Sequence, residues 1–212
     1  MLLALMTLLA SAPLQDPVQQ APPPAPPAPP APSQWTTSLS TYWIEPPHAS
    51  GYLSAVLAAD RGPLHLEAHW AYEDRDTFSV FAGKSFPIEG ELSGHFTPRI
   101  GVAGGNSEGI VPAMALALDW KALSFSTDVE YMIGTSNDTS DFLYSWNELS
   151  YALSDRFHVG LVGQRTNVFD QELTVDRGLL FGVPFGRSAL TAYVFNPDLD
   201  DPYVTIAFGT GF

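Results

Sequence analysis

The most restrictive feature of the sequence is the strict alternation of its last ten residues, 203–212. One face carries Val204, Ile206, Phe208, Thr210 and Phe212, and the other carries Tyr203, Thr205, Ala207, Gly209 and Gly211. Successive side chains of a β-strand point to opposite faces, so the pattern predicts a strand with one apolar face. Chain ends are commonly polar and frayed, which makes an aromatic residue at the end of an apolar face an unusual constraint.

Similar short β-prone segments follow one another over residues 34–212. Twelve strands are predicted, near 35–44, 51–59, 64–72, 77–85, 91–102, 110–119, 122–133, 142–152, 157–168, 173–183, 188–195 and 203–212. Tight turns at 60–63, 87–90, 119–121, 154–156 and 184–187 alternate with longer segments at 45–48, 73–76, 104–108, 134–138, 170–172 and 196–202. Gly, Pro and Asp mark the turns because they suit the backbone geometry of turns. Short turns on one rim and longer loops on the other predict a closed antiparallel up-and-down β-barrel, with ten strands as the alternative count.

The residues before the barrel divide into two segments. Residues 1–12 form an apolar run that ends in Ala10-Ser-Ala12, which is the pattern of a secretory signal peptide and its cleavage site. Residues 13–33 are rich in Pro and Ala and predict a stiff polyproline II tether. The expected organisation is therefore a signal peptide at 1–12, a periplasmic tether at 13–33 and an outer-membrane barrel at 34–212.

Composition favours a folded chain with a lipid-facing surface. Only 15% of the residues are charged, 12% are aromatic, and the formal net charge is −14. A strongly acidic chain is poorly suited to binding nucleic acid, whose phosphates require Lys and Arg. No apolar run has the roughly 18 to 20 residues that a transmembrane helix needs. Aromatic residues near strand ends predict interfacial girdles, and these are Trp35, Tyr42, Trp43, Trp70, Tyr72, Trp120, Tyr131 and Tyr144.

The strand faces predict which side chains line the lumen. Strands 64–72, 91–102 and 122–131 each carry apolar residues on one face and polar or charged residues on the other. In a transmembrane barrel the apolar face meets lipid, whereas in a soluble barrel it would turn inward. The first arrangement predicts Leu66, Phe96, Phe125 and Val129 outside. It also predicts a lumenal polar network of His65, Glu67, His69, His95, Arg99, Asp128, Glu130, Glu148 and Arg165.

Negative charge is concentrated on the longer loops. The expected acidic rim consists of Glu73, Asp74, Asp76, Asp170, Glu172, Asp198, Asp200 and Asp201. An even strand number gathers these loops at one mouth, where their field should attract cations. Divalent cations could then bridge the rim to the phosphates of lipopolysaccharide.

Two short segments contain residues that could bind a metal or take part in catalysis. His65 and His69 are about 13 Å apart on a strand and cannot chelate one metal together. His65 with Glu67, or Glu67 with His69, would need a neighbouring strand, with His95 as a candidate, so no metal site and no cofactor are predicted. The segment Ser145-Trp146-Asn147 resembles the strand of outer-membrane phospholipase A that carries its catalytic Asn. That family also needs a His and a Ser on the preceding strand, and residues 131–138 contain no His.

Two further resemblances concern the whole barrel. The closing strand, with Phe212 at its end, looks like that of bacterial outer-membrane barrels, which implies that Phe212 addresses the chain to the barrel-assembly machinery. Residues 60–67, 142–150, 160–166, 193–197 and 201–202 are similar to a group of small exported barrel proteins from Gram-negative bacteria. This resemblance covers most of residues 35–212 and implies no enzymatic activity.

The expected function is therefore that of a non-enzymatic, porin-like protein of the bacterial outer membrane. It would be a narrow or plugged channel, or a structural surface protein, with an acidic extracellular rim. Its expected partners are the lipid bilayer, lipopolysaccharide and the assembly machinery. Two alternatives remain: an outer-membrane lipid hydrolase or lipid-modifying enzyme, and a secreted soluble barrel that binds an apolar ligand.

Overall fold

A computed structural model describes residues 34–72, 75–136, 139–168 and 174–212. The predicted signal peptide and tether therefore lie outside the described residues. The described residues form strands β1 (Thr36–Glu45), β2 (Tyr52–Arg61), β3 (Leu64–Trp70), β4 (Thr77–Lys84), β5 (Phe86–Ile88), β6 (Ser93–Gly105), β7 (Gly109–Trp120), β8 (Leu123–Gly134), β9 (Phe142–Ser154), β10 (Phe157–Val168), β11 (Thr174–Phe185), β12 (Ser188–Phe195) and β13 (Tyr203–Gly211). None of these residues belongs to a helix long and apolar enough to cross a membrane.

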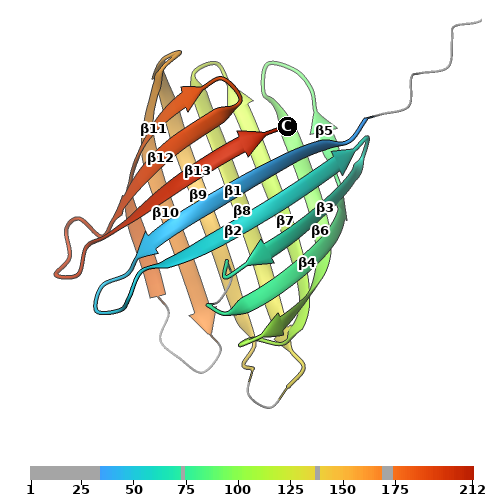
Figure 1. Cartoon of the computed structure of the whole chain (residues 1–212). Coiled ribbons are helices and arrows are strands. Elements are labelled where there is room, and N and C mark those ends of the chain that lie inside the picture. The colour runs from blue at the N-terminus through green and yellow to red at the C-terminus, as the bar shows by residue number, and fades with distance from the viewer. Residues whose placement is uncertain (1–33, 73–74, 137–138, 169–173) are drawn as a thin grey trace, which may run out of the picture. The chain divides into compact units, whose positions relative to one another are not determined.

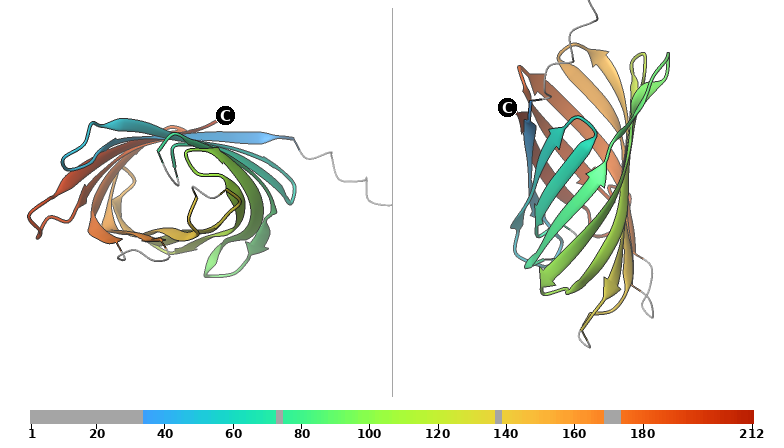
Figure 2. Two further views of the ribbon diagram at one scale, coloured as in Figure 1. Left: turned by 90° about the horizontal axis from the view of Figure 1, so that it is seen from below. Right: turned by 90° about the vertical axis from the view of Figure 1, so that its right-hand side faces the viewer.

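The strands form one antiparallel sheet that closes on itself (Figures 1 and 2). Neighbours in sequence are neighbours in the sheet, and the barrel is sealed where β1 pairs with β13. The last residue takes part in this seam, because the backbone N–H and C=O of Phe212 both bond to Thr37. Each of the twelve predicted strands is present, and the fold class inferred from the sequence is confirmed.

The thirteenth strand, β5, does not add a position to the barrel. It pairs with β6 in the same register as β4, since Gly83 lies opposite Arg99 and Phe86 lies opposite Phe96. β4 and β5 are therefore one strand interrupted near Ser85, and the barrel has twelve strand positions. The prediction of a tight turn at 87–90 is partly wrong, because Phe86–Ile88 continues the pairing and the chain reverses only after it. The ten-strand alternative is also wrong.

The two rims differ as the loop lengths predicted. Two-residue connections join β2 to β3, β7 to β8, β9 to β10 and β11 to β12 at one end, hereafter the turn rim. Gly62 and Gly186 have positive φ there, a conformation that glycine adopts without steric cost. The four-residue connection from β5 to β6 also lies at this rim, where β1 begins and β13 ends. The other connections, of three to seven residues, lie at the opposite end, hereafter the loop rim (Figure 1).

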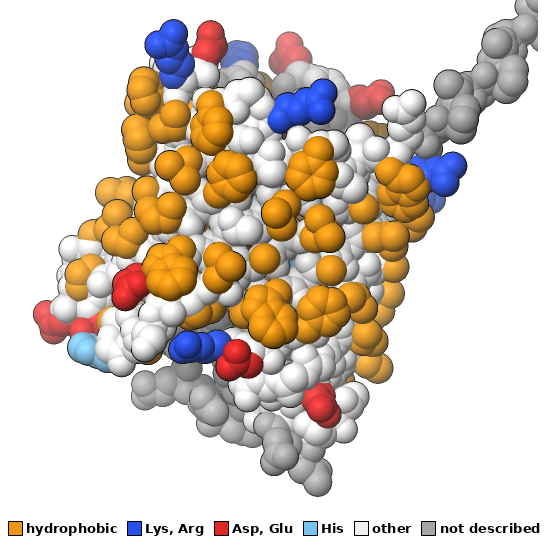
Figure 3. Space-filling view, in the orientation of Figure 1, with side chains coloured by type: hydrophobic (Ala, Val, Ile, Leu, Met, Phe, Trp, Pro, Cys, Tyr) orange, Lys and Arg blue, Asp and Glu red, His pale blue; other side chains and the backbone are white. Residues whose placement is uncertain are grey.

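Large apolar side chains cover the outside of the barrel. Leu161 and Leu179, which are paired on neighbouring strands, are 57% and 55% exposed. Hydrophobic side chains spread over the face formed by β1, β2, β12 and β13, while charged side chains gather toward the rims (Figure 3). Soluble monomers rarely expose continuous apolar patches of more than a few hundred Å². An apolar belt between polar rims is the surface of a transmembrane barrel.

Candidate functional site

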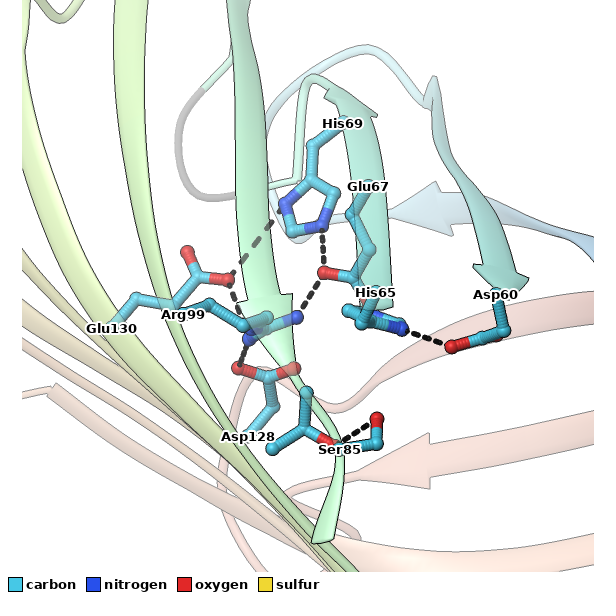
Figure 4. A network of polar contacts seen from close by, with 9 residues as sticks. Asp60, His65, Glu67, His69, Ser85, Arg99, Asp128 and Glu130 are labelled. Atoms are coloured by element: carbon cyan, nitrogen blue, oxygen red, sulfur yellow. Dashed lines mark hydrogen bonds and ion pairs between the residues drawn. The ribbon is translucent and has the colours of Figure 1, made fainter. Parts of the chain in front are cut away.

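A cluster of charged side chains lies inside the barrel, between β3, β6 and β8 (Figure 4). Its centre is Arg99 on β6, whose side chain is fully buried. The guanidinium donates to Glu67 on β3 and to Asp128 on β8, the latter at 2.6 Å, and lies 3.6 Å from Glu130. β3 and β8 are each two strand positions from β6, so Arg99 ties together three separate parts of the wall. We call Asp60, His65, Glu67, His69, Arg99, Asp128 and Glu130 the charged cluster.

Two histidines extend this cluster along β3. His65 lies 2.7 Å from Asp60 and 2.8 Å from Glu67, and His69 lies 3.1 Å from Glu67. The other ring nitrogen of His69 is 3.7 Å from Glu130. Glu67 is therefore surrounded by two imidazoles and a guanidinium, which is how a carboxylate in a low-dielectric interior is stabilised.

The remaining residues of the predicted polar network are dispersed. Glu148 faces the lumen on β9, where it accepts hydrogen bonds from Trp146 at 2.6 Å and from Tyr193 at 2.8 Å. His95 shares the inner face of β6 with Arg99 but is exposed near the turn rim. Arg165 does not line the lumen, which corrects the sequence-based assignment. It is exposed on the same face of β10 as Leu161, and Gln164 beside it lines the interior instead.

A second internal layer consists of aromatic side chains that meet across the lumen. The ring of Tyr42 on β1 lies 6.0 Å from the ring of Trp146 on β9. These two strands are five positions apart through β13, β12, β11 and β10, which is nearly half of the barrel. Tyr72, just after β3, lies 5.4 Å from Tyr144 on β9, and Tyr42 lies 6.0 Å from Tyr72. We call Tyr42, Tyr72, Tyr144, Trp146, Tyr193 and Phe195 the aromatic layer.

Trp146 holds this layer together. It makes edge-on contacts with Tyr193 at 5.3 Å and Phe195 at 5.5 Å, both on β12. It also packs against two buried apolar groups, one around Met132 and Phe142 and the other around Val162 and Leu180. Edge-to-face pairs at these separations are favourable beyond the area they bury. The rings therefore join opposite walls into one packed layer.

The sequence places Tyr42, Tyr72 and Tyr144 at the lipid interface, and this prediction is wrong because all three side chains lie inside the barrel. Tyr42 follows the inner face of β1, whereas its neighbour Trp43 is exposed outside. Tyr72 turns inward because β3 ends at Trp70 and Ala71 takes a φ of 51°, which breaks the alternation. Tyr144 shares the inner face of β9 with Trp146 and is 2% exposed. Trp35, Trp43, Trp70 and Trp120 do lie exposed on the surface.

On the loop-rim side of the aromatic layer is a cavity of about 600 Å³, hereafter the loop-side cavity. Tyr42, Tyr72, Tyr144 and Trp146 line its inner end, and Tyr52 and Tyr203 line its wall. Its polar lining includes Ser54, Gln164, Asp176, Asn196, Asp200 and Asp201. Asp176 accepts hydrogen bonds from Asn196 at 2.6 Å and from Tyr203 at 3.1 Å, which fixes the carboxylate in the wall.

The predicted acidic rim is only partly within the described residues, because Glu73, Asp74, Asp170 and Glu172 lie outside them. Asp76 is exposed, and Asp200 and Asp201 line the loop-side cavity. Two of these carboxylates have partners from other segments: Arg177 forms an ion pair with Asp198 at 2.6 Å, and a ring nitrogen of His48 lies 2.8 Å from Asp201. The hydrogen bond from the Arg177 guanidinium, with a backbone N–H, lowers the pKa of the Asp198 carboxyl.

The residues around Asn147 and the possible metal ligands can be compared with the two alternatives weighed from the sequence. Asn147 lies on the outer face of β9 and hydrogen bonds to Ser145, Thr127 and the carbonyl of Gly163, none of which is an imidazole. Within the part of the chain that the structure describes, no three His, Asp or Glu side chains are arranged to hold a metal ion.

The architecture defines the class: an all-β, closed, twelve-stranded antiparallel barrel with an apolar outer face and with charged and aromatic side chains inside. Solved structures of the KdgM porin share this fold. One has a TM-score of 0.57 at 10% identity, and the match covers 84% of this chain and 99% of that chain. Another, solved as the KdgM porin in complex with disordered oligogalacturonate, has a TM-score of 0.58 at the same identity and coverage. Neither a protein-family model nor a curated protein matches the sequence.

Proposed function

We propose that this protein is a non-enzymatic barrel of the bacterial outer membrane whose lumen is plugged by the aromatic layer. The observation that carries the proposal is the contact between Tyr42 and Trp146, because their strands lie on nearly opposite walls. The charged cluster fills a further part of the same lumen, where Arg99 draws β3, β6 and β8 together. The charged cluster lies along one side of the lumen, between β3 and β8, so the aromatic layer, which joins opposite walls, is the part that closes the path to a hydrated solute.

The membrane location is supported by the outer surface. Exposed Leu, Val, Ile and Phe side chains occupy the outward positions of most strands, which suits lipid and opposes a soluble barrel that binds an apolar ligand. The fold shared with the KdgM porin agrees with this location. Fractionation, together with heat-modifiable migration of the detergent-folded protein, would test it. A protein that stays soluble without detergent would refute the membrane assignment.

The charge of the loop rim makes a cationic partner more suitable than an anionic one. Asp76, Asp200 and Asp201 are exposed there, and carboxylates gathered at one mouth raise the local concentration of cations. Oligogalacturonate, the ligand of the similar porin, is itself a polyanion and would be repelled. We therefore propose that divalent cations bind at this rim and bridge it to lipopolysaccharide phosphates.

Planar-bilayer recording tests the plug. The native protein should show no sustained conductance steps, whereas Tyr72→Ala combined with Trp146→Ala should open a path between the walls. The current through this variant should be cation-selective at low salt and lose selectivity as the Debye length falls from about 30 Å at 0.01 M to about 3 Å at 1 M.

Trp120→Ala with Tyr151→Ala is the matched control, since both rings are exposed on the outside. This variant should remain closed. Sustained conductance of the native protein, or anion-selective current through the opened variant, would refute the proposal. Heat-modifiable migration establishes that each variant has folded before it is recorded.

We also propose that Phe212 serves as an assembly signal. It is 60% exposed, so its own packing contributes little to the folded barrel. Deleting it should nevertheless lower the amount of assembled barrel in the outer membrane strongly. Normal membrane levels of the truncated protein would show that Phe212 is not an address.

A further inference from the structure

The loop-side cavity has the dimensions of a ligand site rather than a pore entrance. Its volume of about 600 Å³ falls within the range of roughly 300 to 1,000 Å³ that small-molecule sites occupy. The aromatic layer forms its inner end, so a molecule that enters from the loop rim meets a closed floor.

Charge in this cavity has one sign. Asp176, Asp200 and Asp201 line it, and none of its described lining residues is Lys or Arg. His48 and Arg75 are the basic groups nearby: His48 contacts Asp201 at 2.8 Å, and Arg75 lies 5.2 Å from the ring centroid of Tyr52. The latter contact places the guanidinium of Arg75 over the face of a lining ring, the geometry of a cation–π interaction within the protein itself.

A second, independent observation is an unpartnered hydroxyl in the cavity wall. Ser54 on β2 is fully buried and lines the cavity, and its Oγ has no hydrogen-bond partner among the described residues. Leaving a buried hydroxyl unpaired is costly, so such a group in a ligand-sized cavity marks a position where a ligand can bond. β2 and β11 are four positions apart in the sheet, which places Ser54 and Asp176 on different walls.

We propose that the loop-side cavity binds an organic cation that carries a primary ammonium group on a flat or cyclic body. The ammonium pairs with Asp176, the body packs against the tyrosine rings and Trp146, and the hydroxyl of Ser54 bonds to a polar atom on the opposite side of the ligand. An ammonium supplies three donors, and Asp176 retains acceptor capacity beyond its bonds to Asn196 and Tyr203. The inference rests on the proposed function only in using the aromatic layer as a floor.

Calorimetry on the full-length, detergent-folded protein tests this with three probes of the same size: benzylammonium, benzyl alcohol and benzoate. Benzylammonium should bind about tenfold more tightly than benzyl alcohol, and benzoate should give no binding heat, since only the ammonium gains from the carboxylates. Equal binding of the ammonium and the alcohol, tighter binding of benzoate, or no binding by any probe would overturn the proposal.

Two substitutions locate the site. Asp176→Asn keeps a group that can bond to both Asn196 and Tyr203, so it should reduce the preference for benzylammonium about fivefold or more without unfolding the wall. Asp119→Asn, an exposed carboxylate at the turn rim, is the control and should change nothing. Unchanged selectivity of Asp176→Asn would overturn the assignment.

Ser54→Ala separates a ligand role from a structural one. Because the Ser54 hydroxyl has no described partner, its removal should leave the unfolding midpoint unchanged or raise it. A probe with a second polar group, 4-(aminomethyl)benzyl alcohol, should lose several-fold affinity in this variant. Reduced stability with unchanged affinity would mean that the hydroxyl serves the fold alone. The two proposals can fail independently. Sustained conductance of the native protein would refute the plugged lumen, whereas the binding of the three probes would still test the cavity.

Discussion

The charged cluster and the aromatic layer both lie inside the barrel, but different forces hold them. In the charged cluster, three carboxylates converge on one buried guanidinium, so the loss of the guanidinium removes the cation that all three share. In the aromatic layer, each ring has several neighbours, and removal of one leaves space rather than an unpaired charge. The first layer is therefore expected to act as a structural tie between β3, β6 and β8, and the second as a removable plug.

The largest effect should come from removing the cation of the charged cluster. Arg99→Met keeps much of the side-chain volume but leaves Glu67, Asp128 and Glu130 without their guanidinium. We expect a loss of about 3 to 5 kcal/mol in the free energy of unfolding, measured by urea titration in lipid vesicles. Arg99→Lys restores a point charge and should recover part of the loss. A change below about 1 kcal/mol for Arg99→Met would mean that the cluster is not a structural tie.

A charged side chain on the lipid-facing surface should lower the free energy of unfolding, in contrast to the charges of the charged cluster inside the barrel. Leu179 lies near the middle of β11 and is exposed outside, so Leu179→Arg should cost about 2 to 4 kcal/mol. Phe185, on the same face but at the turn rim, is the depth control, and Phe185→Arg should cost about 1 kcal/mol or less. Equal costs at the two depths would contradict a lipid-facing belt. Phe125, which the sequence also predicts to face lipid, lies only two residues from the turn-rim end of β8. A substitution there would not test the cost of a charge at the bilayer midplane.

A smaller effect is expected where the two kinds of interaction meet. Tyr193 stacks on Phe195 and also donates a hydrogen bond to Glu148, which Trp146 shares. Tyr193→Phe keeps the ring and removes only the donor, so it should cost about 1.5 to 3 kcal/mol in the same urea titration. Tyr151→Phe, on the exposed outer face, is the matched change and should cost nothing measurable. If both variants unfold at the native midpoint, Glu148 is not a significant acceptor.

The smallest effect should come from the exposed pair at the loop rim. Arg177→Gln removes the main donor that lowers the pKa of Asp198, so that pKa should rise toward its ordinary value in an NMR titration. A carboxyl with a lowered pKa stabilises the fold above its unfolded-state pKa, and this contribution is lost as the pH falls through the folded-state pKa. Both side chains are largely exposed, so the unfolding midpoint should hardly move. A large shift of the midpoint would assign this pair a structural role.

The barrel and most of the charged cluster could be predicted from the sequence, because both follow from the alternation of side chains along the strands. Turn residues and period-two alternation specify strand number and facing, and a charged residue such as Arg99 or Asp128 indicates which face avoids lipid. Arg165 was misplaced because charge alone was used there, although Leu161 on the same face of β10 places that face outside. The acidic residues on the longer loops were identified, but their partners, such as His48 for Asp201, come from distant segments.

The aromatic layer was missed because aromatic residues suit both the lipid interface and a packed interior. Adjacent Tyr42 and Trp43 offered a usable signal, since neighbours on a strand cannot both face lipid. Tyr72 offered none, because its inward turn depends on the left-handed backbone of Ala71. The contact between Tyr42 and Trp146 joins strands far apart in the sequence, and no local pattern specifies it.

The most direct test of the plugged lumen is the proximity of rings from opposite walls. Solution NMR of the detergent-folded protein, with labelled aromatic side chains, reports contacts between ring protons. We expect nuclear Overhauser effects between Tyr42 and Trp146 and between Tyr72 and Tyr144. Trp146→Ala should remove the first, and Tyr72→Ala should remove the second. Well-resolved rings with no cross-wall contact in the native protein would contradict a closed lumen.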